Sequence, residues 1–413
     1  MRGELITAED RSGMTPVRVS VPVVFDYLLS HLGFFAVLPV LPPLLGRLLP
    51  DAGPWFIGAA LFAFNFAVRG ASLFCATVLH QVPVRRAMIS GLLMAAFGFA
   101  LLPVAPGRLG IVGCLLLAGT GISTNGLMAR VYVAMSLESA ARRNTVFSAI
   151  QVAVNVSAAL GPILANVMLG RDMYTPLLLV AAGMYVLAAV AVALLVPSGM
   201  RPRDGDVRPP LRLGLLRAVV ADPHVRRVSL ITAVGGFLYA QFFSAIALHV
   251  VHVTDSVGLR AGFFTANAVF VVLLQVPVSA YVARRMSTGT SSVRFLTVGV
   301  MIFGAAFAVM AVGGAAVIGV FAVVAVFSLA ETFFTPTVNT AFSEIPGGRP
   351  VVELFNLRQV AATAGESIGA FCGGALFATA MQHDMQPVYW GAVAVFGVLA
   401  AVPYLRHPAQ RTI

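Results

Sequence analysis

The sequence predicts an all-α integral membrane protein with twelve transmembrane helices in two six-helix bundles. Three observations favour this fold class: an apolar composition, a series of long apolar runs, and one long polar interruption near the middle. Of 413 residues, 59% are hydrophobic and 10% charged, and the mean hydropathy is +0.92. About a quarter of the residues are charged in ordinary soluble domains. The chain therefore belongs in a bilayer.

Twelve runs are long enough to cross about 30 Å of hydrocarbon at about 1.5 Å per helical residue. They are continuously apolar, whereas the strands of a membrane barrel would alternate apolar and polar residues. The predicted spans are 20–47, 55–80, 87–105, 109–135, 145–169, 175–197, 228–253, 263–283, 294–312, 316–341, 358–381 and 387–405.

The polar interruption at 198–227 is rich in Pro and Arg and divides the helices six and six. The predicted parts are a cytoplasmic N-terminus 1–19, a bundle 20–197, a cytoplasmic linker 198–227, a second bundle 228–405 and a cytoplasmic C-terminus 406–413. Most other loops are too short for a soluble catalytic domain. Two equal bundles suggest alternating access around a site between them, as in secondary transporters.

The basic residues decide between nucleic-acid binding and membrane topology. All 27 are Arg, and 21 of them fall on one side of the predicted membrane when the N-terminus is inside. The other side holds only Arg47, Arg108, Arg171 and Arg260. This split is the positive-inside signature, so we expect a multi-pass protein of the cell (cytoplasmic) membrane with both termini cytoplasmic. Nucleic acid is not implied.

No metal site or cofactor is predicted. Cys75, Cys114 and Cys372 lie in three separate spans without the spacing of a metal site or a disulfide framework. The stretch "GTGISTNG" in the fourth span resembles a phosphate-binding loop only superficially, because it lacks the Lys of that motif. An ATP-driven pump is therefore excluded.

Charged residues inside the spans are costly in a bilayer, so they are the candidates for function. Asp26 and Arg130 each lie roughly 9 Å from the cytoplasmic end of their helices, counting ~1.5 Å per residue. They could form an ion pair that only packs or gates, or Asp26 could belong to a proton or cation site. His31, about 140° around the helix from Asp26, is either a core histidine or a relay. Arg69 needs a counter-charge that the sequence does not identify.

Two glutamates are further candidates for proton coupling. Glu331 lies near the midplane of the tenth span on a polar stripe with Ser328, Thr335 and Asn339. Such a stripe indicates a helix face that lines a water-accessible interior, where a partly buried carboxylate can carry a proton. The alternative is a satisfied structural carboxylate.

Glu366 shares a face with Gln359 and Thr363 and has Gly365, Gly369 and Gly373 on the adjacent edge. The glycines predict a close-packing seam. Glu366 itself could line the cavity or hydrogen-bond a neighbouring helix.

Further side chains are candidates for the cavity wall. Gln151 and Asn155 lie one turn apart on the fifth span. The segment "GGFLYAQFF" supplies Tyr239, Phe242 and Phe243, and the first span supplies Phe34 and Phe35. In a chain with 29 Phe, packing or lipid-facing aromatics are the alternative to a wall for flat, amphipathic ligands.

The fifth span, "SAIQVAVNVSAALGPILAN", fits the pattern G-x8-G-x3-G-P-x2-G-G at Ser148, Ser157, Gly161, Pro162, Ala165 and Asn166. Small residues and a proline at these positions predict a bent, closely packed helix. With this motif the chain resembles the major facilitator superfamily, specifically its twelve-helix drug:proton antiporter branch. Asp26 followed by "LPVLPP", and Glu331 in "LAETFFTP", are similar to acidic motifs of that family.

The loop after the second span departs from the family pattern G-x-x-x-D-R-x-G-R-R. His80 stands at the position of its Asp, Gln81 at that of the neighbouring Arg, and Arg85 keeps the last basic residue. The Arg that the family has four residues before a glycine of the fourth span is also absent, since Leu115 precedes Gly119. These departures concern gating and proton coupling rather than the fold.

The resemblance implies a monomeric secondary transporter, not an enzyme, that exports a small amphipathic compound in exchange for protons. Uptake or facilitated diffusion of a small polar metabolite is the alternative within transport. A membrane-embedded enzyme and a non-transporting sensor are alternatives of other classes. The enzyme would need acidic metal ligands or a nucleophile and base on interfacial loops, and the sequence offers neither.

Overall fold

A computed structural model describes residues 16–79, 81–137, 140–169, 171–201, 217, 219–346 and 351–405. Within these ranges every regular element is helical. Twelve helical segments are long and apolar enough to cross a membrane, which confirms the predicted fold class. They are 17–48, 54–74, 84–104, 107–136, 149–169, 174–195, 223–253, 257–287, 292–313, 317–343, 354–382 and 386–404.

The contacts divide the chain into two compact units. The first comprises the described residues within Met1–Leu38 and Ala67–Pro210, and the second those within Pro39–Phe66 and Leu211–Ile413. The division at 210/211 falls inside the predicted linker, most of which lies outside the described residues. Residues 39–66 group with the second unit because they pack on its helices, although the sequence assigns them to the bundle 20–197. The boundaries of the two bundles thus stay a prediction.

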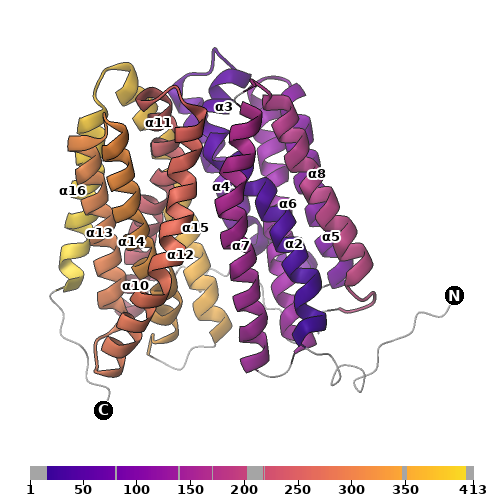
Figure 1. Ribbon diagram of the computed structural model, residues 1–413. Coiled ribbons are helices and arrows are strands. Elements are labelled where there is room, and N and C mark those ends of the chain that lie inside the picture. The colour runs from indigo at the N-terminus through magenta and orange to yellow at the C-terminus, as the bar shows by residue number, and fades with distance from the viewer. Residues whose placement is uncertain are drawn as a thin grey trace. The chain divides into compact units, whose positions relative to one another are not determined.

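The first unit is built on five long helices and the second half of α4 (Pro54–Leu79). Helix α2 packs along α7 and α8, and α5 packs along α6 and α8 (Figure 1). These helices are α2 (Pro16–Val37), α5 (Val84–Leu101), α6 (Gly107–Ser136), α7 (Ala140–Leu169) and α8 (Tyr174–Leu195), with the short 3-10 turn η2 (Leu102–Val104) after α5.

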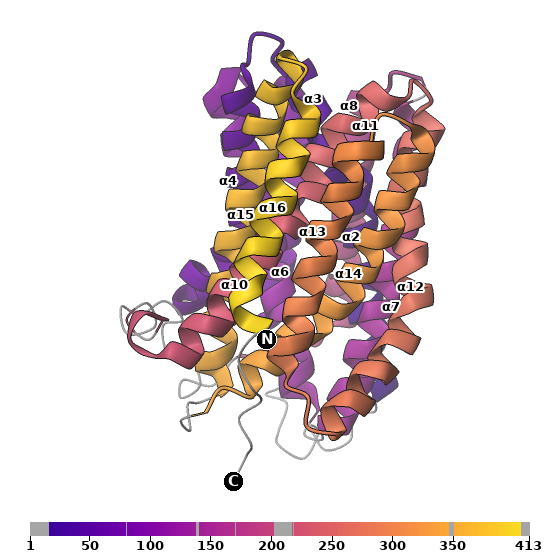
Figure 2. The ribbon, with the colours of Figure 1, turned by 90° about the vertical axis from the view of Figure 1, so that its left-hand side faces the viewer.

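In the second unit, α13 packs along both α14 and α16, and α10 packs along α15 (Figure 2). The helices are α3 (Leu41–Leu48), α10 (Pro223–Gln241), α11 (Ala247–Val253), α12 (Val257–Ser287), α13 (Ser292–Gly313), α14 (Val317–Ser343), α15 (Val351–Gln382) and α16 (Gln386–Leu405). Helix α12 extends several residues beyond the predicted span 263–283 at both ends.

Two of the spans pass through a non-α turn into a second α-helix. The first passes from α2 through the 3-10 turn η1 (Leu38–Val40) into α3, where Pro42 and Pro43 lack the N–H groups that would continue the α-helical ladder. The seventh passes from α10 through the π-helical turn η3 (Phe242–Ile246) into α11. A π-turn inserts an extra residue into the helix and is common near functional sites.

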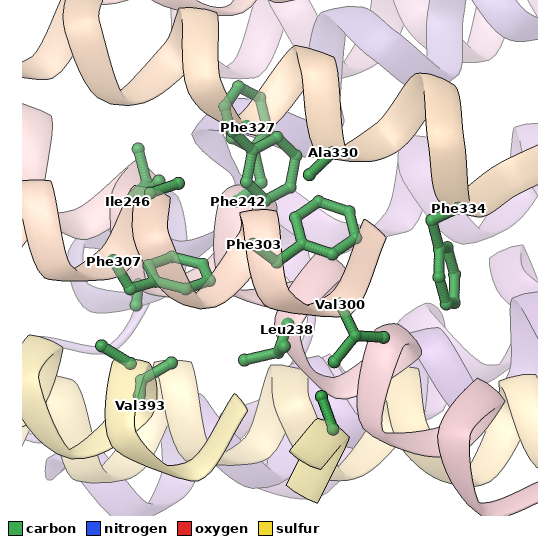
Figure 3. Packing of buried hydrophobic residues seen from close by; sticks show 14 of the residues in the cluster. Leu238, Phe242, Ile246, Val300, Phe303, Phe307, Phe327, Ala330, Phe334 and Val393 are labelled. Carbon is green, nitrogen blue, oxygen red and sulfur yellow. The ribbon is translucent and has the colours of Figure 1, made fainter. Parts of the chain in front are cut away.

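The core of the second unit is aromatic (Figure 3). The ring of Phe327 on α14 lies 4.6 Å from that of Phe242 and 4.7 Å from that of Phe303, centroid to centroid. All three side chains are fully buried. Phe242 therefore packs inside the unit, whereas Phe243 is half-buried at its edge.

Close helix packing depends on small residues in both units. A Cβ on Gly161 of α7 would lie 2.7 Å from the backbone of Phe35 on α2, so only glycine fits there. On α15, a Cβ on Gly365, Gly369 or Gly373 would overlap atoms of α10 or η3. The predicted glycine seam of α15 is thus confirmed, and the fifth span is closely packed as predicted, with Pro162 inside it.

Candidate functional site

Asp26 is fully buried in the first unit, and its partner is a carboxamide. Nδ2 of Asn125, on α6, donates to Oδ1 of Asp26 at 3.0 Å and to Oδ2 at 3.1 Å. One turn along α2, Ser30 Oγ donates to the Asp26 backbone carbonyl at 2.7 Å. The carboxylate is thereby fixed between α2 and α6.

The ion pair between Asp26 and Arg130, one of the two predicted alternatives, is not formed among the described residues. Arg130 is exposed, and its Nε donates to the carbonyl of Gly126 at 2.8 Å. Asn125 occupies both oxygens of Asp26 instead. Asp26 and Arg130 lie at similar depth in the predicted spans, but depth does not fix the rotation of a helix. Arg130 lies about 140° around α6 from Asn125.

The Asn125 side chain is itself only half satisfied. Its Oδ1 is buried and accepts no hydrogen bond from any described residue. If Asp26 takes up a proton, its new O–H group can donate to this oxygen while Nδ2 continues to donate to the other carboxyl oxygen. A carboxamide can hold a carboxyl group in either protonation state because it carries both a donor and an acceptor.

Glu331 on α14 has a similar partner in the second unit. Nδ2 of Asn267, on α12, lies 3.2 Å from Glu331 Oε2 and 3.0 Å from Ser328 Oγ. Tyr239 on α10 is a further side-chain hydrogen-bond partner of Glu331. Three helices thus converge on this carboxylate.

The predicted polar stripe of α14 is divided between two environments. Ser328 is fully buried and donates to the Val324 carbonyl at 2.7 Å. Glu331 is half-buried, and Thr335 and Asn339 are exposed. The stripe therefore leads from the interior of the unit to its surface, with Glu331 between.

The remaining charged candidates are placed as follows. Glu366 on α15 is half-buried, and its side chain lies against Gly236 of α10, where a Cβ would come within 3.3 Å of it. Arg69 on α4 is exposed and interacts electrostatically with His31.

The polar candidates of α7 contact one another and α2. Gln151 donates to Asn155 at 3.1 Å along the helix surface. Ser157 is fully buried and donates to the Leu28 carbonyl of α2 at 2.9 Å. In the loop after α4, Gln81 is exposed and His80 lies outside the described residues, while Arg85 lies half-buried in the first turn of α5.

His31 lies in an aromatic ladder on α2. Its ring stacks on that of Tyr27, with centroids 4.8 Å apart and planes 13° from parallel. The rings of Phe34 and Phe35 follow, each 6.3 Å from His31. Ser30 Oγ lies 3.3 Å from His31 Nδ1, so the histidine has a local polar partner.

The carboxamide partners of the two carboxyl groups are not predicted from the sequence. In the sequence, Asn125 stands out only as part of a stretch that resembles a phosphate-binding loop, and Asn267 is not among the predicted site residues. Gln241, fully buried beside η3, was also missed: it donates to the Gly369 carbonyl at 2.9 Å and accepts from the Tyr389 hydroxyl at 2.6 Å. An amide within an apolar run was the available signal, because a buried amide needs partners.

Among the described residues there is no group of three or more His, Cys, Asp or Glu side chains that could hold a metal ion.

Comparisons with known proteins agree with this architecture. The Major Facilitator Superfamily profile matches residues 23–352. The multidrug resistance protein MdtH of Edwardsiella ictaluri is 22% identical over 384 residues, covering 91% of each chain. That of Aeromonas hydrophila is 24% identical over 382 residues, covering 90% of this chain and 91% of the relative.

Solved structures share the fold at low identity. An auto-inhibited POT family peptide transporter superposes with a TM-score of 0.74 at 16% identity, covering 96% of this chain and 99% of the other. The nucleoside transporter NupG superposes with a TM-score of 0.75 at 11% identity, covering 94% of this chain and 99% of the other. The chain belongs to the Major Facilitator Superfamily and is a multi-pass membrane transporter of small-molecule substrates, not an enzyme.

Proposed function

We propose that this transporter exports a small amphipathic compound and that protons drive the export by antiport. The observation that carries the proton coupling is the pair of carboxyl groups, Asp26 and Glu331, each held by an asparagine from another helix. Neither has an arginine partner among the described residues.

The choice of partner decides what a buried carboxyl group can do. An adjacent arginine favours the ionised form and would have to be separated from it before a proton could bind. An amide donates to the ionised form and can also accept from the protonated form. Proton uptake at Asp26 or Glu331 therefore requires no ion pair to break.

The two carboxyl groups have different exposure. Asp26 is fully buried, whereas Glu331 is half-buried beside the exposed end of the α14 stripe. Glu331 is thus the better placed of the two to exchange a proton with water, and we assign it the principal coupling role. Asp26 is a second proton site, and Glu366 is a third candidate.

Export of amphipathic compounds is supported by the two relatives named multidrug resistance protein, which match over nine-tenths of the chain. The peptide and nucleoside transporters share only the fold and do not favour uptake of a polar metabolite. We further propose that the protein works as a monomer in the cell membrane with both termini cytoplasmic.

The test is transport of a fluorescent amphipathic dye by the purified protein in liposomes, with and without an imposed proton gradient. We expect Glu331→Gln to abolish gradient-driven transport while dye binding stays within about twofold, because the amide keeps the shape but cannot exchange a proton. Asp26→Asn should weaken the response to the gradient.

Glu344→Gln is the matched control, since it makes the same change at the end of α14, where the carboxylate accepts from Ser292. It should leave coupling intact. Gradient-driven transport by Glu331→Gln at the wild-type rate would remove Glu331 from the mechanism. If the wild-type protein transports the dye at the same rate with and without the proton gradient, antiport is refuted.

A further inference from the structure

The geometry points to a binding site in the first unit for the anionic group of the exported compound, with Arg130 as its receptor and the Tyr27–His31 stack as its apolar wall. The inference rests on the proposed export function and names its substrate class: an amphipathic organic anion that carries a carboxylate or phosphate on an aromatic body.

The direction of the Arg130 side chain is the first step. Arg130 lies six residues before the end of α6 at Ser136, so a snorkelling arginine would extend toward that end to reach the membrane surface. Its Nε instead bonds the carbonyl of Gly126, one turn nearer the middle of the helix. The guanidinium group is thus directed away from the nearest membrane face.

The second step is what Arg130 meets there. The Gly126 carbonyl also lies 3.5 Å from the Tyr27 hydroxyl, so one acceptor joins Arg130 of α6 to Tyr27 of α2. Arg130 acts electrostatically on Tyr27. The charge is therefore held beside the first ring of the aromatic ladder on α2.

A second guanidinium group acts on the other ring of the stack. Arg69 of α4 acts electrostatically on His31, whose ring stacks on Tyr27 at 4.8 Å. Both arginines are exposed. Arg130 and Arg69 thus each act electrostatically on one ring of the stacked pair, and all four residues lie in membrane-spanning segments of the same unit.

The third step is the counter-charge of Arg130, which none of the described residues supplies. Asp26, the carboxylate nearest in sequence to the stack, has both oxygens bonded by Asn125. Within the described ranges Arg130 makes one hydrogen bond, through Nε, so its two terminal nitrogens bond none of the described residues. A planar guanidinium group with free terminal nitrogens matches a carboxylate or phosphate with two parallel hydrogen bonds. A charge in a membrane segment without such a partner is costly.

The probe is radiolabelled 2-naphthoate, whose flat ring suits the stack and whose carboxylate suits Arg130; 2-naphthamide is the neutral control of the same shape. Binding is measured by equilibrium dialysis on the full chain in phosphatidylcholine nanodiscs. We expect Arg130→Gln to weaken 2-naphthoate binding at least about tenfold, the loss typical of one charge-assisted contact, and to change 2-naphthamide binding less than twofold.

Arg130→Lys keeps the charge but loses the planar guanidinium group, so its affinity for 2-naphthoate should lie between those of the wild-type protein and Arg130→Gln. Binding by Arg130→Lys also shows that a loss in Arg130→Gln is not caused by a folding defect. Arg108→Gln, at the other end of α6, is the matched control and should bind as wild type. Equal loss of naphthoate and naphthamide in Arg130→Gln, or no loss of either, would overturn the proposal.

A lipid phosphate presents the same chemistry as a soluble anion, so a second arm replaces part of the phosphatidylcholine by phosphatidylglycerol. Unchanged 2-naphthoate affinity supports a soluble substrate; competition by the anionic lipid would assign Arg130 to a headgroup and overturn the proposal. Binding is measured without a proton gradient, so failure of antiport in liposomes would not affect the binding result. Likewise, failure of 2-naphthoate to bind would not refute proton antiport.

Discussion

At the scale of single residues, a carboxamide differs from an arginine as a partner because it leaves the charge of a buried carboxylate uncompensated. Asn125 and Asn267 each bond a carboxyl group on another helix while carrying no charge themselves. The hydrogen bonds fix the position of the carboxyl group, and its protonation state stays free to change. This combination suits a group that must gain and lose a proton in place.

Asn125→Leu tests this role of Asn125. The substitution keeps the approximate volume but leaves Asp26 without its partner, so we expect a loss of stability of about 1–3 kcal/mol, read as a lower unfolding temperature in detergent. In the double variant Asp26→Leu/Asn125→Leu the two apolar side chains should recover part of that loss. Strictly additive effects of the two substitutions would show that the pair is not coupled.

In the second unit, the roles of Asn267 and Ser328 in transport can be distinguished by substitution. Asn267→Leu removes a hydrogen bond to Glu331, whereas Ser328→Ala removes only a neighbour that also bonds the Val324 carbonyl. We expect Asn267→Leu to reduce gradient-driven dye transport in liposomes at least about tenfold, the weight of one contact to a charged group, and Ser328→Ala to reduce it less than threefold. Equal effects would contradict a positioning role for Asn267.

The sequence revealed the carboxyl groups of these sites but not their partners. Asp26, Glu331 and the arginines stand out because charge is rare in apolar spans. Asn125 lies 99 residues from Asp26, and its contact depends on how α6 is rotated against α2. Helical periodicity determines which residues share a face, but it does not determine which neighbouring helix that face meets. For this reason the sequence left two alternatives open for Asp26, and the ion pair with Arg130 is the one that is not formed among the described residues.

At the scale of helices, the glycine seam of α15 sets how closely α10 can approach. A Cβ on Gly369 would overlap the backbone of Phe237, whereas a Cβ on Gly391 of α16 meets no atom within 4 Å. We expect Gly369→Ala to lower the unfolding temperature, at a cost of about 1–3 kcal/mol for overpacking.

Gly391→Ala is the matched control, because it makes the same change on a helix with open space. It should be neutral or stabilising by up to about 1 kcal/mol, the difference in helix propensity. If both variants unfold at the same temperature, the seam does not limit the packing of α10 on α15.

All twelve spans were predictable because each needs enough apolar residues to cross the bilayer. The ends of α12 were not, since hydropathy detects the part of a helix that lies in hydrocarbon. Arg260 and Arg284 mark the edges of that part, yet both belong to the helix Val257–Ser287. The Arg260 side chain bonds the carbonyls of Thr254 and Val251, which precede this helix.

At the scale of the whole molecule, the two units use the same order of helix pairs. The first span packs on the fifth and the third on the fourth; the seventh packs on the eleventh and the ninth on the tenth. In each unit the first of these contacts depends on glycine: Gly161 faces α2, and Gly369 faces α10. Repeated architecture of this kind is expected of transporters built from two similar halves.

The repeat could not be read from the sequence. Spans of similar composition differ in few residues that specify a neighbour, so the count of helices is evident while their pairing is not. The linker allowed the halves to be proposed, but the grouping of 39–66 with the second unit had no signal in the sequence.

Membrane orientation is the prediction that concerns the whole chain. The 21 arginines on one side against four on the other predict that reporters fused at 84, 143, 210, 288, 350 and 410 are cytoplasmic and those at 50, 107, 172 and 258 external. Reporter enzymes active on only one side of the membrane provide the measurement. A cytoplasmic signal from residue 172 would contradict the arrangement of six spans before the linker.

The π-turn η3 has a consequence for how this chain tolerates change in length. Each residue added to or removed from a helix rotates everything beyond it by about 100°, and η3 accommodates one more residue than an α-helical turn would. His249, three residues beyond it, contacts the Gly314 carbonyl at 2.8 Å. Deleting one residue from Phe242–Ile246 would restore a regular α-helix, but it would rotate His249 away from the Gly314 carbonyl. A one-residue gap at this place in an alignment therefore marks a change in how α11 contacts the α13–α14 connection.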